Sequence, residues 1–258
     1  MIQRVVANPL ERLPEGGKNA LKGLYSFSAS LTGSVVRVST RERAAALTFD
    51  DGPHPEVTPR LLDLLGSRGA RATFFLVGRA AASHRALVKR MAAEGHALGN
   101  HTWNHLSMPL LTSRWRRIQI DWCREVLDEC GAQPMRLFRP PYGHQTPTSQ
   151  LDAVRTGHRV IGWDAIAEDW LDDPAETLVA RVERRLRPGS IVLFHDRLYH
   201  AVDPAHFDRG PTLEAVEMLL DRHPDYSFVT VPELLALGRP YRWHWYQRPN
   251  LEWLRRLL

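Results

Sequence analysis

The sequence contains few cysteines, no long apolar run and no block of basic residues. Only two of its 258 residues are cysteines, Cys123 and Cys130, and they lie seven positions apart in a stretch with a helical pattern. This separation along a helix axis is too large for a disulfide, so we expect two free thiols. The 34 basic and 29 acidic residues leave a formal charge of +5. A charge this small and dispersed does not indicate a nucleic-acid partner.

The N-terminal region has no apolar stretch of the length that a signal peptide or a membrane span requires. Its apolar character stops at Asn8 and Pro9, and the mildly apolar segment 20–38 is interrupted by Lys22 and Gly23. We therefore expect no transmembrane segment. A cytoplasmic location follows from this interpretation, and association with the cell envelope is the alternative.

Short apolar runs alternate with longer helical stretches from residue 44 onward. The apolar runs predict seven strands, at residues 45–49, 72–77, 96–100, 136–139, 159–163, 190–194 and 226–231. The intervening stretches predict helices near residues 58–66, 80–94, 112–130, 147–156, 174–186, 211–222 and 232–237. Such alternation is typical of a parallel sheet with helical crossovers. The sequence thus predicts an α/β fold, a closed or nearly closed (β/α) barrel that forms a single domain.

Chemically reactive side chains follow five of the seven predicted strands. They are Asp50 and Asp51 after the first strand, His101 and His105 after the third, Arg139 and Tyr142 after the fourth, Asp169 after the fifth and His195 after the sixth. The active site of a (β/α) barrel lies at the carboxyl ends of its strands. A single polar residue at a strand end is common in any α/β protein, but five such ends together favour an enzyme.

His101 and His105 are four residues apart in the segment GNHTWNH. A helical turn would bring both imidazoles to one side, as a divalent metal ion requires. The zinc-peptidase motif has the same spacing but a glutamate directly after its first histidine, where Thr102 stands here. The third ligand and the general base must therefore come from elsewhere in the chain.

Two adjacent carboxylates in the segment LTFDDGPHP can supply both missing groups. Neighbouring side chains of a regular strand point to opposite faces, so Asp50 and Asp51 share a site only if the strand is broken there. Gly52 and Pro53 predict such a break. One carboxylate would then hold the ion while the other takes a proton from water.

These segments resemble the motifs of the NodB-type polysaccharide deacetylases, carbohydrate esterase family 4, which occur in order across roughly residues 44–237. The first family motif, T-F-D-D-G-P, is present unaltered, and the resemblance implies Asp50 as catalytic base and Asp51 as metal ligand. The second motif, H-[ST]-x-x-H, implies His101 and His105 as the other two ligands.

The third and fifth motifs of the family imply further roles. R-x-P-[YF] is present as R-P-P-Y, which implies that Arg139 orients Asp50 and that the backbone N–H of Tyr142 helps to bind an oxyanion. L-x-H is present as L-F-H, which implies His195 as general acid and Leu193 as a substrate contact.

The fourth motif departs from the family pattern D-x-x-D-W. The corresponding segment reads I-A-E-D-W, so Asp169 and Trp170 are retained but Ile166 replaces the first aspartate, unless Asp164 serves from a shifted position. A carboxylate beside an imidazole favours the imidazolium, so Asp169 is expected to keep His195 protonated. Trp170 is expected to stack on a sugar or to line the pocket.

The resemblance implies a metal-dependent hydrolase that removes an N-acetyl or N-formyl group from an amino sugar in a glycan or glycan precursor. The implied fold is a distorted (β/α) barrel of about seven parallel strands, in agreement with the strand count. The implied cofactor is a divalent ion, Zn²⁺ first, with Co²⁺, Ni²⁺ or Mn²⁺ as alternatives. The implied partner is an N-acetylated glycan or oligosaccharide.

Three other functions compete with this interpretation. An amidase of the same scaffold would act on a small linear or cyclic amide, and a non-catalytic relative would only bind carbohydrate. A non-haem iron oxygenase also binds its ion through two histidines and one carboxylate, but the closely spaced His-x-Asp/Glu pair of those sites is absent here.

Two segments lie outside the deacetylase domain, which we place at residues 44–238. Residues 1–43 form an N-terminal extension without an assigned role. Residues 239–258 form an aromatic and basic tail, in which leucines near helical spacing predict a short amphipathic helix. Such a helix would dock on the barrel or make peripheral contact with an anionic membrane surface.

Overall fold

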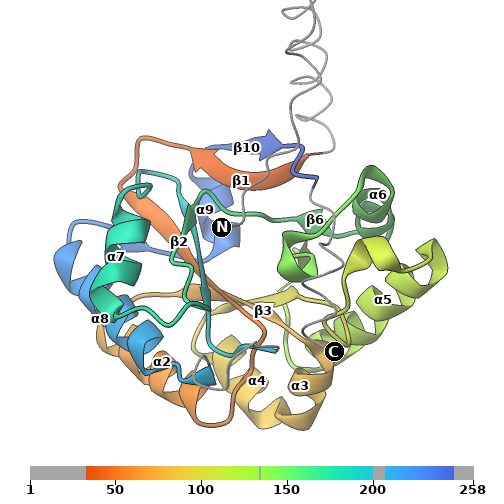
Figure 1. Ribbon diagram of the computed structural model, residues 1–258, viewed down its shortest axis with the longest axis horizontal. Coiled ribbons are helices and arrows are strands. Elements are labelled where there is room, and N and C mark those ends of the chain that lie inside the picture. The colour runs from red at the N-terminus through yellow and green to blue at the C-terminus, as the bar shows by residue number, and fades with distance from the viewer. Residues whose placement is uncertain (1–32, 134, 200–206, 247–258) are drawn as a thin grey trace, which may run out of the picture.

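The structure, a computed structural model, describes residues 33–133, 135–199 and 207–246, which fold around one curved parallel sheet (Figure 1). Seven strands follow one another across this sheet in the order β6-β5-β4-β3-β2-β8-β7, and every neighbouring pair is parallel. They are β2 (Ala44–Asp50), β3 (Ala72–Leu76), β4 (Ala97–Asn100), β5 (Leu137–Phe138), β6 (Arg159–Val160), β7 (Ala165–Ile166) and β8 (Ile191–His195). The short strand β9 (Ser227–Phe228) pairs with the first residues of β2. The predicted single domain with a distorted (β/α) barrel is confirmed.

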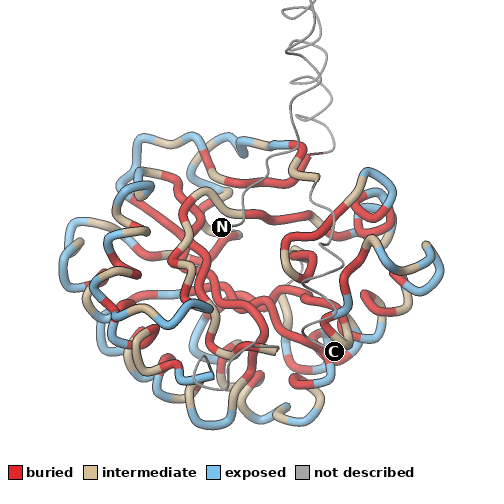
Figure 2. Tube along the Cα trace, in the orientation of Figure 1, coloured by how far each residue is buried: buried red, intermediate tan, exposed pale blue. Residues whose placement is uncertain are grey.

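Helices surround this sheet and cover its outer face, except for the last helix, Val231–Ala236, which packs against the apolar cluster on the inner side (Figure 1). They are α2 (Val57–Ser67), α3 (Gly78–Ser83), α4 (Arg85–Ala93), α5 (Ser113–Glu129), α6 (Pro147–Arg155), α7 (Ala175–Glu183), α8 (Gly210–Arg222) and α9 (Val231–Ala236), with short 3₁₀ turns η2 (Met108–Leu110) and η3 (Pro141–Gly143). Thr112 and Thr146 cap α5 and α6 by accepting backbone N–H groups of their first turns. Figure 2 shows the strands buried and the exposed residues along the outer sides of the helices.

Side chains of the central strand β2 alternate between two apolar layers. Phe49 points outward into the layer between sheet and helices, where its ring stacks on those of Phe74 and Phe194. Ala46 belongs to a second apolar cluster inside the curved sheet. Because side chains of a strand alternate with a period of two, Asp50 at the end of β2 points to the inner side.

An antiparallel strand pair connects the two ends of the curved sheet. It consists of β1 (Ser34–Ser39) and β10 (Arg239–Trp243). Isolated bridges join Val35 of β1 to Ile161, which follows the edge strand β6, and Arg37 to Ser190, which precedes β8. Strand β1 therefore ties the β6 edge of the sheet to the strand beside its other edge.

The structure differs from the sequence-based expectations in three segments. The strand predicted at 159–163 ends at Val160, because the Gly162 N–H donates to Val35 and its carbonyl accepts from Arg139. The unpredicted strand β7 then follows at the opposite edge of the sheet. The strand predicted at 226–231 is reduced to the two residues of β9. The helix predicted at 80–94 is divided at His84, whose backbone is not helical.

The structure also bears on the expectations for the cysteines, the C-terminal tail and membrane-spanning helices. Cys123 and Cys130 are buried free thiols, as predicted. The first residues of the predicted tail form strand β10, and the predicted amphipathic helix beyond them lies outside the described residues. No helix in the described ranges is long and apolar enough to cross a membrane.

Candidate metal and catalytic site

The strand register brings the predicted site residues together at the carboxyl ends of the parallel strands. Asp50 pairs directly with His195 across β2 and β8, and the last residues of β4 and β5 pair with each other. His101 and Arg139 are the residues that directly follow those two strands. The carboxyl ends of these parallel strands therefore surround one site, as the barrel interpretation requires.

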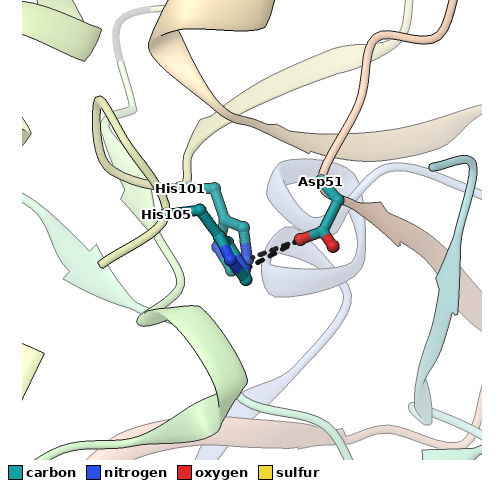
Figure 3. Close-up of side chains that lie close together, drawn as sticks. All are labelled: Asp51, His101 and His105. Atoms are coloured by element: carbon teal, nitrogen blue, oxygen red, sulfur yellow. Dashed lines mark ion pairs between the residues drawn. The ribbon is translucent and has the colours of Figure 1, made fainter. Parts of the chain in front are cut away.

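Asp51, His101 and His105 form a buried cluster at these strand ends (Figure 3). The Oδ1 atom of Asp51 lies 3.3 Å from His101 Nε2 and 3.0 Å from His105 Nε2. The other carboxylate oxygen of Asp51 accepts the backbone N–H of Tyr199 at 2.9 Å. The three side chains thus turn one oxygen and two nitrogens toward a common point, and together they could hold a metal ion.

The hydrogen bonds around the cluster test whether a cation fits it. His101 Nδ1 lies 2.7 Å from the carbonyl oxygen of Arg139, which can only accept, so Nδ1 carries the hydrogen. The lone pair of His101 Nε2 then faces Asp51 Oδ1, to which no described group donates a hydrogen bond. Two acceptors this close repel unless a cation lies between them. Ligands about 2.1 Å from a tetrahedral ion lie about 3.4 Å apart, so the observed separations fit a divalent ion.

The charge of Asp51 is stabilised by the same neighbours. Burial alone would raise the pKa of this carboxyl, but the positive charge of nearby imidazoles, His105 first and also His195, holds the pKa well below its ordinary value. Asp51 is therefore ionised near neutral pH, as a carboxylate ligand must be.

Five non-glycine residues of the described ranges have a left-handed backbone, and all five lie in the loops of the predicted motifs. They are Asp51, Thr102, His105, Tyr142 and Glu168, with φ between 56° and 74°. Such conformations are unfavourable for residues with a Cβ atom and gather at functional sites, where the surrounding structure maintains them. The positions of these turns therefore support a common site at the strand ends.

Two of these turns explain how the predicted ligands converge. The left-handed backbone of Asp51, followed by a cis peptide between Gly52 and Pro53, confirms the predicted break of the strand. The helical turn predicted for His101 and His105 is wrong, since the segment is an irregular loop. Left-handed residues at Thr102 and His105 turn the two imidazoles to the same side instead.

Asp50 is held by a fully buried arginine. Arg139 Nη1 donates to Asp50 Oδ1 and to Thr48 Oγ1, each at 2.7 Å, and Nη2 donates to the carbonyl of Gly162 at 3.0 Å. The guanidinium also lies 4.1 Å from the ring centre of Phe75. The second oxygen of Asp50 remains on the side of the metal-ligand cluster, 3.8 Å from His101 Nε2. This geometry matches the predicted orientation of Asp50 by Arg139.

His195, which is partly buried, forms a second pair with the buried Asp169. His195 Nδ1 lies 2.8 Å from Asp169 Oδ1, and the backbone N–H of His195 donates to Asp169 Oδ2 at 2.8 Å. Burial lowers the pKa of the imidazole, but the adjacent Asp169 outweighs burial, and the pKa rises to about 9. His195 is therefore protonated near neutral pH, and its Nε2 atom points away from Asp169.

Comparison with known proteins identifies the family. A model described as polysaccharide deacetylase matches residues 37–161. A chitooligosaccharide deacetylase from Azorhizobium caulinodans is 36% identical over 169 residues, which are 65% of this chain and 80% of that protein. A peptidoglycan-N-acetylglucosamine deacetylase from Bacillus cereus is 35% identical over 202 residues, 77% of this chain and 91% of that protein. The chain belongs to the polysaccharide deacetylase family.

Solved structures agree with this assignment. The structure of a peptidoglycan N-acetylglucosamine deacetylase superposes with a TM-score of 0.70 at 28% identity, covering 81% of this chain and 94% of that one. A pseudoenzyme of carbohydrate esterase family 4 from Bacillus anthracis gives a TM-score of 0.71 at 25% identity, covering 84% and 74%. As a member of this family, the chain is a hydrolase of the polysaccharide deacetylase type.

The structure shows where Ile166 and Asp164 lie in the fourth motif, which departs from the family pattern. Ile166 lies in β7, paired with Leu193 of β8. Asp164 does not take the place of the missing aspartate, because its carboxylate accepts the backbone N–H of Ile191 and the side chain of Arg187. These contacts lie at the beginning of β8, whereas the deacetylase site lies at its end. The alternative role of Asp164 is therefore excluded.

The three residues predicted to contact substrate lie in different environments. The Tyr142 ring packs 4.5 Å from the His105 ring, and its left-handed backbone places it in the 3₁₀ turn η3. Trp170 is 36% exposed and approaches the His195 ring edge-on at 5.5 Å. Leu193 is buried and points to the inner side of the sheet, since Phe194 points outward.

Several residues near the deacetylase site were not predicted from the sequence. Tyr199 bonds Asp51 through its backbone N–H, and Asp196 is a buried carboxylate directly after His195. Arg209 and Thr212 contact Asp169 from the beginning of α8. Asp196 follows a predicted strand, so the rule of reactive strand ends could have found it. The other three lie in loops or helices, where no motif marks them.

Proposed function

We propose that this protein is a metal-dependent N-deacetylase that removes the acetyl group from an amino sugar of a glycan or glycan precursor. The observation that carries the proposal is the arrangement of two buried carboxylates with different partners. Asp51 faces two histidines, whereas the adjacent Asp50 is bonded to Arg139 and keeps one oxygen toward the same point. One carboxylate can thus hold an ion while the other remains free to act as a base.

Asp51, His101 and His105 would hold the divalent ion, with Zn²⁺ as the first choice because of the nitrogen and oxygen ligands. Such an ion, when bound, would polarise the amide carbonyl and make a nearby water more acidic. The hydrogen bond from His101 Nδ1 to Arg139 fixes the tautomer that leaves Nε2 available as a ligand.

Asp50, Tyr142 and His195 would move protons and stabilise charge. Asp50 takes the proton of the attacking water, with its carboxylate held in place by Arg139. The backbone N–H of Tyr142 donates to the oxygen that gains negative charge. His195, protonated because of Asp169, gives its proton to the departing amine. The products are acetate and a free amino sugar.

The proposed substrate is an N-acetylated glycan, in keeping with the chitooligosaccharide and peptidoglycan named for the relatives. Trp170 would stack on a sugar ring beside His195, and Leu193 would line the floor of the site under the acyl group. An N-formyl group is smaller than acetyl and would also fit this proposal. A glycan of the cell wall would require the protein to reach the cell envelope, which cell fractionation can examine.

Acetate release tests this function. The metal-free protein is loaded separately with Zn²⁺, Co²⁺, Ni²⁺ or Mn²⁺ and incubated with chitooligosaccharides, peptidoglycan and small linear or cyclic amides. We expect acetate from a glycan, and a loss of about 10²–10⁴-fold in kcat for Asp50→Asn at unchanged metal content. Turnover of small amides alone would indicate an amidase, and glycan binding without turnover would indicate a non-catalytic relative. Either result contradicts the proposal.

A further inference from the structure

A second buried arginine lies behind the Asp169–His195 pair, at the position that precedes α8. Arg209 is 3% exposed, and its Nη1 atom donates to the backbone carbonyl of Asp169 at 2.7 Å. The same nitrogen lies 3.5 Å from Asp169 Oδ2 and 3.4 Å from Thr212 Oγ1. Burial lowers the pKa of Arg209, and the charge of Asp169 opposes that shift. A buried cation thus lies beside a carboxylate of the proposed catalytic pair.

The hydrogen bonds of Asp169 leave its carboxylate only one orientation. Oδ1 accepts from His195 Nδ1, while Oδ2 accepts from the His195 backbone N–H and from Thr212 Oγ1 at 3.2 Å. Arg209 holds the backbone of the same residue through the hydrogen bond from its Nη1 atom to the carbonyl oxygen of Asp169. Both the main chain and the side chain of Asp169 are therefore anchored to the beginning of α8, and His195 receives its orientation from them.

The backbone before Asp169 needs such an anchor. Glu168 has a left-handed conformation with φ of 57°, which a residue with a Cβ atom rarely adopts. Arg181 of α7 holds the other side of this turn by donating to the carbonyl of Ala167 at 3.2 Å and by pairing with Glu168. Arg181 makes no contact with Asp169 in the described structure. Both arginines therefore contact the loop that contains Glu168 and Asp169. Of the two, only Arg209 contacts Asp169, the residue that bonds His195.

We propose that Arg209 is a positioning residue that keeps the Asp169–His195 pair in its reactive geometry by holding the backbone of Asp169. The inference rests on the proposed function, in which His195 gives its proton to the departing amine. Without Arg209, the backbone of Asp169 loses its anchor, Asp169 moves away from His195 and the imidazole loses its orientation. The loss then falls on the chemical step rather than on substrate binding.

The pKa of His195 distinguishes positioning from a simple charge effect. The titratable groups that interact with His195 are Asp169, the adjacent Asp196 and, from β2 and its loop, Asp50 and Asp51. If Arg209 acted only through its charge, removing this cation would raise the pKa of the imidazole. If Arg209 holds Asp169 in contact with His195, removing it lowers the pKa instead, because the carboxylate moves away.

The experiment compares Arg209→Met and Arg209→Lys with Arg181→Met as matched control, in the full chain. For Arg209→Met we expect kcat to fall about 10²-fold at unchanged KM, and the pKa of His195, followed by NMR titration, to fall below about 9. Lysine keeps the charge but lacks the planar guanidinium, so it cannot contact Asp169 and Thr212 at the same time. In Arg209→Lys we therefore expect a smaller fall of kcat and of the pKa of His195. Arg181→Met should lower the melting temperature and leave kcat and the pKa of His195 unchanged.

Each outcome has one meaning. A raised or unchanged pKa of His195 in Arg209→Met, or equal losses of kcat in Arg209→Met and Arg181→Met, overturns the inference. Should Arg209→Met fail to fold, Arg209→Lys decides, since wild-type kcat and pKa in that variant also overturn it. A protein that releases no acetate from any substrate contradicts the proposed function, whereas the NMR titration still tests the role of Arg209.

Discussion

The two sides of the site hold their carboxylates in different ways. On the Asp50 side, the guanidinium of Arg139 donates directly to the carboxylate at 2.7 Å. On the Asp169 side, the guanidinium of Arg209 donates to the backbone carbonyl at 2.7 Å, and the carboxylate oxygen lies 3.5 Å away. A buried arginine is present on both sides, but the carboxylate of Asp50 accepts a hydrogen bond from its arginine, whereas that of Asp169 forms a longer ion pair.

This difference matches the different tasks proposed for the two sides. The charge of Asp50 is paired by Arg139, which orients the carboxylate without competing for its second oxygen. The charge of Asp169 is directed at His195 and raises the pKa of the imidazole to about 9. In the proposed mechanism one pair thus supplies an oriented base, and the other supplies an acid that is protonated near pH 7.

Removal of Arg139 should have the largest effect. Arg139→Met leaves Asp50 buried without its cation, and breaking a buried pair in this way costs about 3–5 kcal/mol of unfolding free energy. The same change at Arg209 should cost less, because Arg209 bonds the backbone carbonyl of Asp169 and lies 3.5 Å from its carboxylate. Urea unfolding of both variants measures the difference.

The double variant Arg139→Met/Asp50→Asn provides the control for this prediction. It removes the unpaired charge as well, so part of the lost stability should return. Equal destabilisation by Arg139→Met and Arg209→Met would contradict the distinction between the two sides.

Neutralising Asp169 should have the next largest effect, and it should depend on pH. His195 acts while protonated, so activity is lost as pH rises through its pKa, about 9 in the wild type. In Asp169→Asn we expect this pKa to fall to about 6.5 or lower. At pH 8 the protonated fraction then drops from about 90% to about 3%, roughly a thirtyfold loss of rate.

The pH dependence of kcat/KM measures this shift, and Asp164→Asn serves as the matched control. Asp164 is a carboxylate of the same segment, but it is bonded at the opposite end of β8. Its replacement should leave the alkaline limb in place. An alkaline limb that does not move in Asp169→Asn would show that His195 is not the acid or that Asp169 does not set its pKa.

Removal of Trp170 should have the smallest effect. Trp170→Ala takes away an exposed ring beside His195 without touching either carboxylate pair. We expect KM for glycan to rise about two- to tenfold with kcat nearly unchanged, as for the loss of one aromatic contact. Trp115 on α5 is also exposed, and Trp115→Ala should leave KM unchanged. A rise of KM in both variants would count against a sugar contact at Trp170.

Strands with a clear apolar pattern were predictable from the sequence. Strands that lack such a pattern, or that form by pairing with a distant segment, were not. The seven-residue strand β2 is buried throughout and mostly apolar, and it was found almost to its bounds. Strand β7 has two residues, too few for any periodicity. Strands β1 and β10 pair across roughly two hundred residues of chain, and local patterns contain no information on such a pairing.

The site was predictable where its chemistry follows strand ends and less so where turns or helices complete it. Asp50, Asp51 and His195 lie at or directly beyond the ends of β2 and β8 and were found by position. The spacing of the histidines predicts a helical turn instead, because left-handed backbone is uncommon for any non-glycine residue and no local pattern marks it at Thr102 or His105. Arg209 reaches Asp169 from forty positions away, and only the folded chain brings them together.

The metal content of three purified proteins tests the central claim most directly. Wild type, Asp50→Asn and Asp51→Ala are equilibrated with Zn²⁺, freed of excess ion and analysed for bound zinc per chain, with circular dichroism as a check of folding. The assignment of Asp51 as ligand and Asp50 as unbound base predicts about one zinc in wild type and in Asp50→Asn, and none in Asp51→Ala. Equal zinc in all three proteins, or a folded wild type without zinc, would contradict it.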